Sequence, residues 1–581
     1  MALPTRAHPN HSRIRTRPYT AGVATRSSVS VPLAPGSSRG ELTLFAAVAI
    51  VVLTWAAVYL PALGAFEFKG EEARRMLPAL EMLRGGSPVL PSILGEEYFR
   101  KPPGINWLIA GTVAAAGAPS EWAARLPSAY AVLGFSSTLV LLPGAWLSLR
   151  ARLMGAVLFL ASVGMIEYGR LAEIDAAYAS VGGVAMLVWL ENFANREVGW
   201  RLWLAPSAVV AFGLLLKGPM ILVFYYALVG CVLVSARRGR EFWSWPHAGA
   251  VALMLALFAL WAVPAWLEAA SPDKAGHWTT DMGERLDLAK FNLAQQLDQI
   301  SGGFTSFLPG AVLLPLLWRK NWRQRVPEQH QELFDGARRA LVVGFGLTCL
   351  IIVRTRYFFP LLPLASILCG WVFIETPVWS RARQFWSWTL ITIWTLAAIG
   401  SVAALSMWAA KPAHVFVAVL VISLAIVFWR TRRRWIFHHR PALFGATTVA
   451  VLVPAFLVFA APRVAESAKF SVMAQKISAA VPPLATILVY STPPLPVVYY
   501  LQIDRKVAAF PRDGGASAGG AYLMVEDRQL PTARADPRVA ALDPEPAAHL
   551  DDGEKLQFTI FKLHAAPVDE APHLPAGAIT Q

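Results

Sequence analysis

Charged residues are scarce in this 581-residue chain. Asp, Glu, Lys and Arg make up 15% of the sequence, whereas hydrophobic residues make up 56%. A soluble domain has roughly 25% charged residues. The shortage of charge therefore excludes an ordinary soluble protein and predicts a polytopic α-helical membrane protein.

Cysteine is equally scarce, and the common nucleotide-binding motifs are absent. The three cysteines, Cys231, Cys349 and Cys369, all lie inside apolar runs, where cysteine is typically a small core residue. No group of His and Cys residues has the spacing of a zinc site. Neither a GxGxxG nor a Walker A motif occurs, which argues against a nucleotide-driven pump.

Acidic residues are outnumbered by basic ones, 37 to 52, so the formal net charge is +15. In a soluble protein this excess would suggest a nucleic-acid partner. Here the basic residues lie in short loops between apolar runs, as the positive-inside pattern requires. We therefore expect membrane lipids and not nucleic acid as partners.

The first 40 residues hold almost no acid and are rich in Arg, Ser and Pro, which predicts a disordered basic cytoplasmic tail over 1–40. A membrane domain follows over 41–461, with about thirteen spans, several shorter than the ~20 residues of a straight crossing. The predicted spans are 42–63, 126–147, 151–165, 171–190, 202–216, 220–234, 248–267, 304–318, 340–353, 359–373, 390–408, 415–428 and 443–461.

The loop charges support this count. If the tail lies inside, every basic cluster of the loops falls on the cytoplasmic side. The clusters are Arg150/Arg152, Arg196/Arg201, Arg237/Arg238/Arg240, residues 319–325 with Arg338/Arg339, Arg381/Arg383 and residues 430–440. An odd number of spans then places the C-terminus outside the cytoplasm.

Two segments of the first outer loop are expected to be interfacial helices. Residues 71–84 have helical spacing, with Met76, Leu80 and Leu83 on one side, which is typical of a helix lying on a membrane surface. Residues 105–116 are apolar but too short to cross the bilayer, so they predict a second interfacial or re-entrant helix.

The composition changes after residue 461. Short segments rich in β-branched and aromatic residues, separated by Pro, Gly and Asp, are typical of strands. They cover 485–490, 497–501, 521–525 and 556–563. We expect a small extracytoplasmic α/β domain over 462–581, with a disordered tail from about residue 565.

Isolated polar residues gather on the predicted outer side. A carboxylate there can act as a general base toward an acceptor hydroxyl, and Arg or Lys can stabilise a leaving phosphate. The combination favours transfer from a lipid phosphate, although caps, helix-dipole contacts and snorkelling would also explain single residues. The candidates are Glu71, Glu72, Arg74, Arg100, Lys101, Arg170, Asp175, Lys217, Arg354, Arg356 and Tyr357.

A series of motifs gives these candidates a common context. The motifs are GEEARRMLPALEMLRGG, YFRKPPGINWLIA, EWAARLPSA, GRLAEIDAAY, LLKGPM and RTRYFFPLLPLA. Through them the chain resembles the GT-C glycosyltransferases of the protein O-mannosyltransferase and aminoarabinose transferase (ArnT-like) group, over roughly residues 42–370. The resemblance implies the GT-C fold and an inverting transfer from a polyprenyl-phosphate sugar, undecaprenyl in bacteria. The expected acceptor is lipid A, another envelope glycolipid or a protein Ser/Thr, outside the cytoplasm at a bacterial inner membrane.

The resemblance also assigns roles to matched positions. The catalytic Asp of the family falls on Glu71, its neighbouring Glu on Glu72, and its donor-phosphate Lys on Lys101. The other matched positions are Asp175 in the second outer turn, Lys217 in Lys-Gly-Pro, and the pair Arg356 and Tyr357.

Two positions depart from the family pattern. Glu71 replaces the usual Asp, so its carboxylate lies one methylene further out, and small misplacements can cost about a hundredfold in rate. Arg100 stands where the aminoarabinose transferase has a Glu that helps to bind a metal, and His277 alone is a poor zinc site. We therefore expect no required metal and no cofactor.

Two other functions remain open at this stage. A lipid-linked-sugar flippase or transporter would place ionisable residues near the midplane of broken helices, whereas here they cluster at span ends on one side. A catalytically impaired pseudo-glycosyltransferase is compatible with the substitution at Glu71.

Overall fold

The computed structural model describes most of the chain in several segments. They are residues 42–144, 146–269, 292–319, 326–350, 354–375, 380–407, 411–437, 441–466, 469–491, 493–511, 520–553 and 556–564. By its contacts the chain divides into Met1–Glu41 and Leu42–Gln581. The predicted basic tail, His277 and the predicted C-terminal tail lie outside the described residues.

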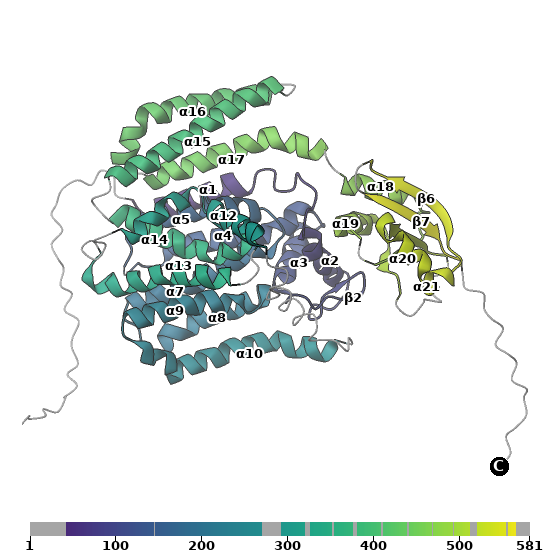
Figure 1. Cartoon of the computed structure of the whole chain (residues 1–581), viewed down its shortest axis with the longest axis horizontal. Helices are drawn as coiled ribbons and strands as arrows, with labels where there is room; N and C mark the ends of the chain where they lie inside the picture. The colour runs from purple at the N-terminus through teal and green to yellow at the C-terminus, as the bar shows by residue number, and fades with distance from the viewer. Residues whose placement is uncertain are drawn as a thin grey trace, which may run out of the picture. The chain divides into compact units, whose positions relative to one another are not determined.

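The second unit is mainly helical up to residue 466 (Figure 1). Several helices begin at a side-chain cap: Thr43, Ser120 and Ser148 each accept the backbone N–H three residues later, as N-cap residues do. The helices are α1 Leu44–Tyr59, α2 Glu72–Leu83, α3 Gly104–Ala116, α4 Glu121–Leu141, α5 Leu149–Leu160, α6 Val163–Tyr168, α7 Ile174–Ala194, α8 Trp200–Lys217, α9 Met220–Ser235, α10 Trp245–Glu268, α12 Leu293–Ser306, η3 Gly310–Trp318, α13 Gln331–Cys349, η6 Thr355–Leu361, α14 Leu362–Glu375, α15 Ser380–Met407, α16 Pro412–Phe437 and α17 Pro441–Glu466.

The helices confirm a multi-pass α-helical membrane protein. Among the described residues, seven helices are long and apolar enough to cross a membrane, or eight if α12 and η3, which meet at 97°, form one broken span. The seven are α7, α8, α10, η6 with α14, α15, α16 and α17. Every predicted span overlaps at least one helix, but 151–165 contains the break between α5 and α6, and 304–318 contains the break between α12 and η3. Helices such as α1 and α9 are also short for a span, so the number thirteen stays a prediction.

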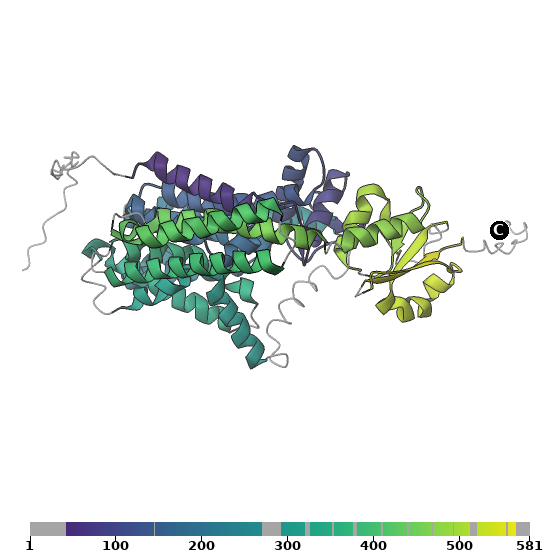
Figure 2. The same cartoon turned by 90° about the horizontal axis from the view of Figure 1, so that it is seen from above.

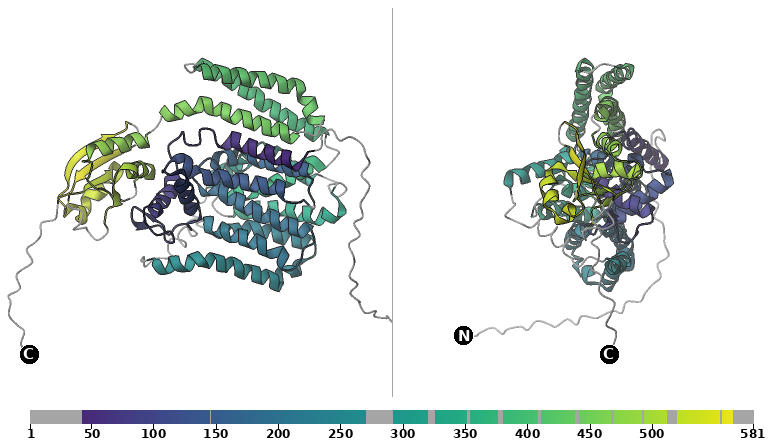
Figure 3. Two further views of the ribbon diagram at one scale, coloured as in Figure 1. Left: turned by 180° about the vertical axis from the view of Figure 1, so that it is seen from behind. Right: turned by 90° about the vertical axis from the view of Figure 1, so that its right-hand side faces the viewer.

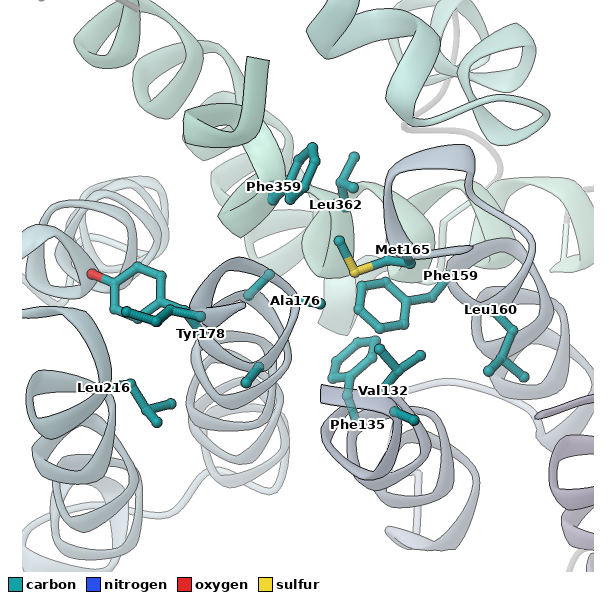
Figure 4. Packing of buried hydrophobic residues seen from close by; sticks show 14 of the residues in the cluster. Val132, Phe135, Phe159, Leu160, Met165, Ala176, Tyr178, Leu216, Phe359 and Leu362 are labelled. Carbon is teal, nitrogen blue, oxygen red and sulfur yellow. The ribbon is translucent and has the colours of Figure 1, made fainter. Parts of the chain in front are cut away.

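Helix α7 lies inside the bundle. Of its most apolar 18-residue stretch, 83% is buried, the same share as for η6 with α14. Figure 4 shows Phe135 of α4, Phe159 of α5 and Phe359 of η6 packed in one cluster around it. Gly183 allows this packing, because a Cβ there would lie 2.5 Å from Pro363 of α14. In contrast α15 and α16 are only 17% and 22% buried, and they lie with α17 along one side of the bundle (Figure 3).

The first outer loop has the two predicted helices, α2 and α3, joined through a short hairpin of β1 Ser92–Ile93 and β2 Glu96–Glu97. Met76 and Leu80 are buried as expected from the helical spacing, whereas Leu83 is 44% exposed. The helical prediction for this loop is therefore confirmed.

Beyond residue 469 the chain forms a five-stranded sheet of order β4-β3-β5-β7-β6. Its strands are β3 Ile487–Val489, β4 Val507–Ala509, β5 Tyr522–Glu526, β6 Glu545–Asp551 and β7 Gln557–Lys562. Strand β3 pairs in parallel with β4 and β5, and the remaining pairs are antiparallel. Figure 2 shows helices on both sides of the sheet, which are α18 Phe470–Ala480, α19 Leu495–Asp504, α20 Leu530–Ala535 and α21 Pro537–Ala540.

One strand expected in this region is wrong. Residues 497–501 form part of the helix α19. Pro496 occupies the first turn of that helix, where proline is tolerated. Val497, Val498 and Leu501 are buried, a spacing that suits a helix resting on a sheet. A short apolar run does not distinguish a buried strand from a buried helix by its periodicity.

Candidate active site

A buried ion pair anchors the first outer loop. The side chains of Glu72 and Arg125 are 0% and 2% exposed. The guanidinium donates to both carboxylate oxygens, at 2.7 and 3.0 Å. Such a bidentate pair is strong and geometrically specific, so it fixes the start of α2 against α4.

The same two side chains also bind the backbone around them. Arg125 donates to the carbonyls of Leu63, Phe66 and Glu67 at 2.8–3.1 Å. The carboxylate of Glu72 accepts the N–H groups of Lys69 at 3.0 Å and Ala172 at 2.8 Å. The catalytic role predicted for Glu72 is not tested by these contacts, but its carboxylate is occupied in holding the loop.

Glu71 is placed quite differently from its neighbour. It is the N-cap residue of α2, and its side chain is 32% exposed. Arg74 donates to both of its oxygens, at 3.0 and 2.8 Å, and Arg75 lies 3.6 Å away. The carboxylate is thus oriented by two arginines and partly open to solvent.

A second charged cluster forms where three helices end. Asp175 lies in the first turn of α7, Lys217 is the last residue of α8, and Arg356 lies in η6. Lys217 donates to one carboxylate oxygen of Asp175, and Arg356 lies 3.5 Å from the other. Gly218, at φ +98°, ends α8 directly after Lys217.

Aromatic rings complete the surroundings of Lys217. Its ammonium lies 5.5 Å from the ring centre of Tyr178 and 5.3 Å from that of Tyr357, within the range of cation–π attraction. The structure thus brings together four residues predicted from distant motifs. They are Asp175, Lys217, Arg356 and Tyr357.

The sequence interpretation missed Glu173, which joins the two halves of the site. Its carboxylate accepts a hydrogen bond from Arg356 at 3.0 Å. A Cβ on Gly70 would lie 3.4 Å from its Oε1, so the residue before Glu71 approaches it closely. Burial is the main cause that raises the pKa of Glu173 to about 7, and the nearby charge of Asp175 is the second. The positive charge of Arg356 opposes the shift.

Arg75 also contacts this region, although it was not among the site residues predicted from the sequence. Its guanidinium donates to the hydroxyl of Tyr98 at 2.7 Å, and its charge acts on both Glu173 and Asp175. With Glu71 also within 3.6 Å, Arg75 connects the exposed carboxylate with the cluster at the helix ends.

Three of the predicted arginines lie elsewhere. Arg170 donates to the carbonyls of Val58 and Pro61, both at 2.6 Å, and burial lowers its pKa to about 10. It ties the turn before α7 to the end of α1. Arg100 and Arg354 are exposed, and no contact described for them joins either one to the cluster. Lys101 is half-buried shortly before α3.

An apolar cavity of about 470 Å³ is lined in part by η6. Phe358 and Leu361 of η6 line it, directly after Arg356 and Tyr357 in the chain. The other large side chains of its wall are Phe304, Phe307, Trp318 and Phe345. One short helix thus presents charge to the cluster and apolar surface to the cavity.

Within the segments that the structure describes, no three His, Cys, Asp or Glu side chains are close enough to hold a metal ion. The expectation that no metal is required stays a prediction.

Comparison with known proteins identifies the architecture. Residues 100–263 match the family model described as dolichyl-phosphate-mannose-protein mannosyltransferase. The fold is similar to that of ArnT from Cupriavidus metallidurans. The structure of that protein bound to undecaprenyl phosphate superposes with a TM-score of 0.66 at 17% identity, over 89% of this chain and 97% of the other. Its apo structure gives a TM-score of 0.62 at the same identity and coverage.

A comparison with curated proteins found no match. The family match begins at Arg100, so it contains RKPPGINW and the EWAARLPSA motif. Residues 100–263 are thus similar to a mannosyltransferase family model, and the chain shares the fold of the ArnT structure.

Proposed function

We propose that the chain transfers a sugar from a polyprenyl-phosphate donor, undecaprenyl phosphate in a bacterium, to an acceptor on the outer face of the membrane. The acceptor is lipid A, another envelope glycolipid or a protein Ser/Thr. The similar ArnT structure contains bound undecaprenyl phosphate, which supports a donor of this class.

The observation that carries the proposal is the placement of the cationic cluster beside the apolar cavity. Lys217 and Arg356 offer two cations at one point, and cations of this kind stabilise the negative charge that develops on a leaving phosphate. Phe358, two residues after Arg356 in the chain, lines the cavity. A lipid phosphate needs this combination, because its head is anionic and its tail is apolar.

Glu71 is the proposed general base. It is the predicted carboxylate that is open to solvent next to the cluster, so an acceptor hydroxyl can reach it. An ionised carboxylate retains lone pairs for a second hydrogen bond while Arg74 binds it. Proton transfer to Glu71 makes the acceptor oxygen a nucleophile toward the sugar carbon, whose bond to the phosphate oxygen breaks. A single displacement of this kind inverts that carbon.

Glu72 is proposed to position Glu71 rather than to react. Its carboxylate binds Arg125 and two backbone N–H groups, and it is fully buried. Asp175 is proposed to orient Lys217 and Arg356, which it contacts simultaneously. Lys101 remains a proposed donor contact on the strength of the Phe-x-Lys-Pro motif alone.

The membrane orientation is part of the proposal. The charge distribution of the loops favours a cytoplasmic N-terminus and an extracytoplasmic C-terminal domain over 462–581. The site residues then lie on the outer side of a bacterial inner membrane, within a glycosyltransferase domain over 41–461.

A transfer assay tests the function. Purified membranes containing the wild type or Lys217→Ala receive radiolabelled undecaprenyl-phosphate sugars. We expect label to move into a lipid or protein fraction with the wild type and to be lost with the variant. Arg201→Ala is the control, because Arg201 is a basic residue that is 81% exposed and lies on the predicted cytoplasmic side. Donor that binds but never transfers its label would contradict the proposal and favour a flippase or a pseudo-enzyme. Activity that disappears with a chelator would contradict the absence of a required metal.

A further inference from the structure

The region beyond residue 469 contacts the first outer loop at the residues just before Glu71. The hydroxyl of Tyr500, on α19, accepts the backbone N–H of Phe68 at 3.1 Å and donates to the carboxylate of Glu121 at 2.5 Å. The ring of Phe68 is fully buried and lies 4.7 Å, centre to centre, from that of Tyr499. Both the backbone and the side chain of Phe68 are therefore held from the C-terminal side.

Glu67 makes a second contact between the same two regions. Its carboxylate accepts the backbone N–H groups of Lys469, Phe470 and Ser471 at 2.7–3.1 Å. These groups belong to the start of α18, where N–H groups have no partner within the helix and a negative charge is favourable. The N-terminus of α18 is thus capped by a residue that lies about four hundred positions earlier in the chain.

A continuous series of contacts leads from this anchor to the catalytic carboxylate. Phe68 also lies against the guanidinium of Arg125, whose Cζ is 5.5 Å from the ring centre. Arg125 in turn binds Glu72, the residue next to Glu71. Gly70, at φ +57°, makes the bend between the anchored residues and Glu71.

We infer that the C-terminal domain is a positioning element of the transferase, in which Tyr500 and the start of α18 fix the loop that carries Glu71. This inference rests on the proposed function. Tyr500 contacts no reacting group, so it acts through the two residues that its hydroxyl binds, Phe68 and Glu121. A base must be placed within a fraction of an ångström of its productive position, because small displacements are costly in rate.

The test uses the full-length protein with Tyr500→Phe, which removes one hydroxyl and leaves the ring. Hydrogen exchange at the amide of Phe68 reports the contact directly, since that N–H loses its acceptor. We expect its exchange rate to rise about fivefold or more. We also expect kcat to fall by about tenfold while the KM for the donor stays unchanged.

Tyr490→Phe is the matched control. The hydroxyl of Tyr490 donates to Asp536 at 3.1 Å within the C-terminal domain, away from the loop. This variant should match the wild type in both measurements. Glu67→Gln, which removes the charge at the start of α18, should reproduce the effect of Tyr500→Phe.

Each result has a definite consequence. Unchanged exchange at Phe68 in Tyr500→Phe would overturn the inference, and so would faster exchange with an unchanged kcat. If the wild type transfers sugar from no donor and the amide of Phe68 still becomes exposed in the variant, the proposed function is wrong while the anchoring of the loop stands.

Discussion

Glu71 and Glu72 are adjacent in the chain, yet they belong to two regions with different physical character. Glu72 is fully buried and binds Arg125 together with backbone N–H groups, whereas Glu71 is partly exposed and faces the partly exposed Arg74 and the buried Arg75. A buried ion pair that is broken leaves an uncompensated charge. An exposed pair contributes little to stability. The comparison teaches that one carboxylate maintains the loop while the other is free to react.

The largest effect is expected at Glu71. Glu71→Gln should lower the turnover number by roughly 10²–10⁴-fold, because the variant cannot accept a proton from the acceptor. The thermal unfolding temperature should remain close to that of the wild type, since Glu71 and Arg74 are both partly exposed and such a pair contributes little to stability. Single-turnover transfer and unfolding of the same detergent-purified preparation check both points. A variant with normal turnover would remove Glu71 from the mechanism.

Glu72→Gln should show the opposite pattern. Removing the charge of Glu72 leaves the guanidinium of Arg125 buried without its counter-ion. Breaking a buried ion pair in this way lowers the free energy of unfolding by about 3–5 kcal/mol. The measurement is thermal unfolding of the purified protein, with Glu197→Gln, an exposed pair with Arg201, as control. Wild-type stability together with lost turnover would mean that Glu72 reacts and that the two roles are exchanged.

Lys217→Ala should weaken transfer by about a hundredfold, a typical loss when one group that stabilises developing charge is removed. Lys217→Arg keeps the charge but changes its geometry, so it should recover part of the activity. Initial rates over a range of donor concentrations separate the effect on binding from that on turnover. Equal rates for wild type and Lys217→Ala would show that the phosphate lies elsewhere.

The smallest effect is a dependence of donor binding on pH. The pKa of Glu173 is about 7, so this carboxylate is protonated at pH 6 and ionised at pH 8. The charges of Lys217, Arg356, Asp175 and Glu173 then add to +1 at the lower pH and to zero at the higher. A polyprenyl-phosphate sugar is a diester with one constant negative charge, so its affinity should fall by about threefold to tenfold as the pH rises through 7.

Glu173→Gln sharpens this test. The variant should bind donor at every pH with about the affinity that the wild type shows at pH 6, because its side chain stays neutral. Equilibrium binding of a non-transferable donor analogue between pH 6 and 8 measures the effect. A pH dependence that survives in the variant would assign the titration to a different group.

Much of the fold could be predicted because apolar runs and loop charges report the membrane directly. Each predicted span overlaps one or two helices, and the outer-loop helices α2 and α3 lie where helices were predicted. The prediction of a strand at residues 497–501 was wrong because a five-residue apolar run is too short to show a helical or a strand periodicity. Tertiary contact with the sheet, and Pro496 in the first turn, decide in favour of the helix.

Motifs indicated Asp175, Lys217 and Arg356, which the structure brings together, while the roles of these residues and of Glu71 stay predictions. The partners were missed because their importance depends on which helices meet. Arg125 lies in the EWAARLPSA motif, and a lone charge in an apolar helix is a usable signal. The sequence does not indicate that Glu173 belongs to the site. Its raised pKa follows from its burial and from the nearby charge of Asp175, which only the folded structure shows.

The central claim is that the cluster of Asp175, Lys217 and Arg356 holds the donor phosphate while Glu71 is the general base. Donor binding by the wild type and two variants tests this claim most directly. A labelled undecaprenyl-phosphate sugar is titrated into the wild type, Glu71→Gln and Lys217→Ala, and transfer is followed in the same samples. The account predicts wild-type affinity without transfer for Glu71→Gln, and strongly reduced affinity for Lys217→Ala. Lost affinity in Glu71→Gln with unchanged affinity in Lys217→Ala would contradict it.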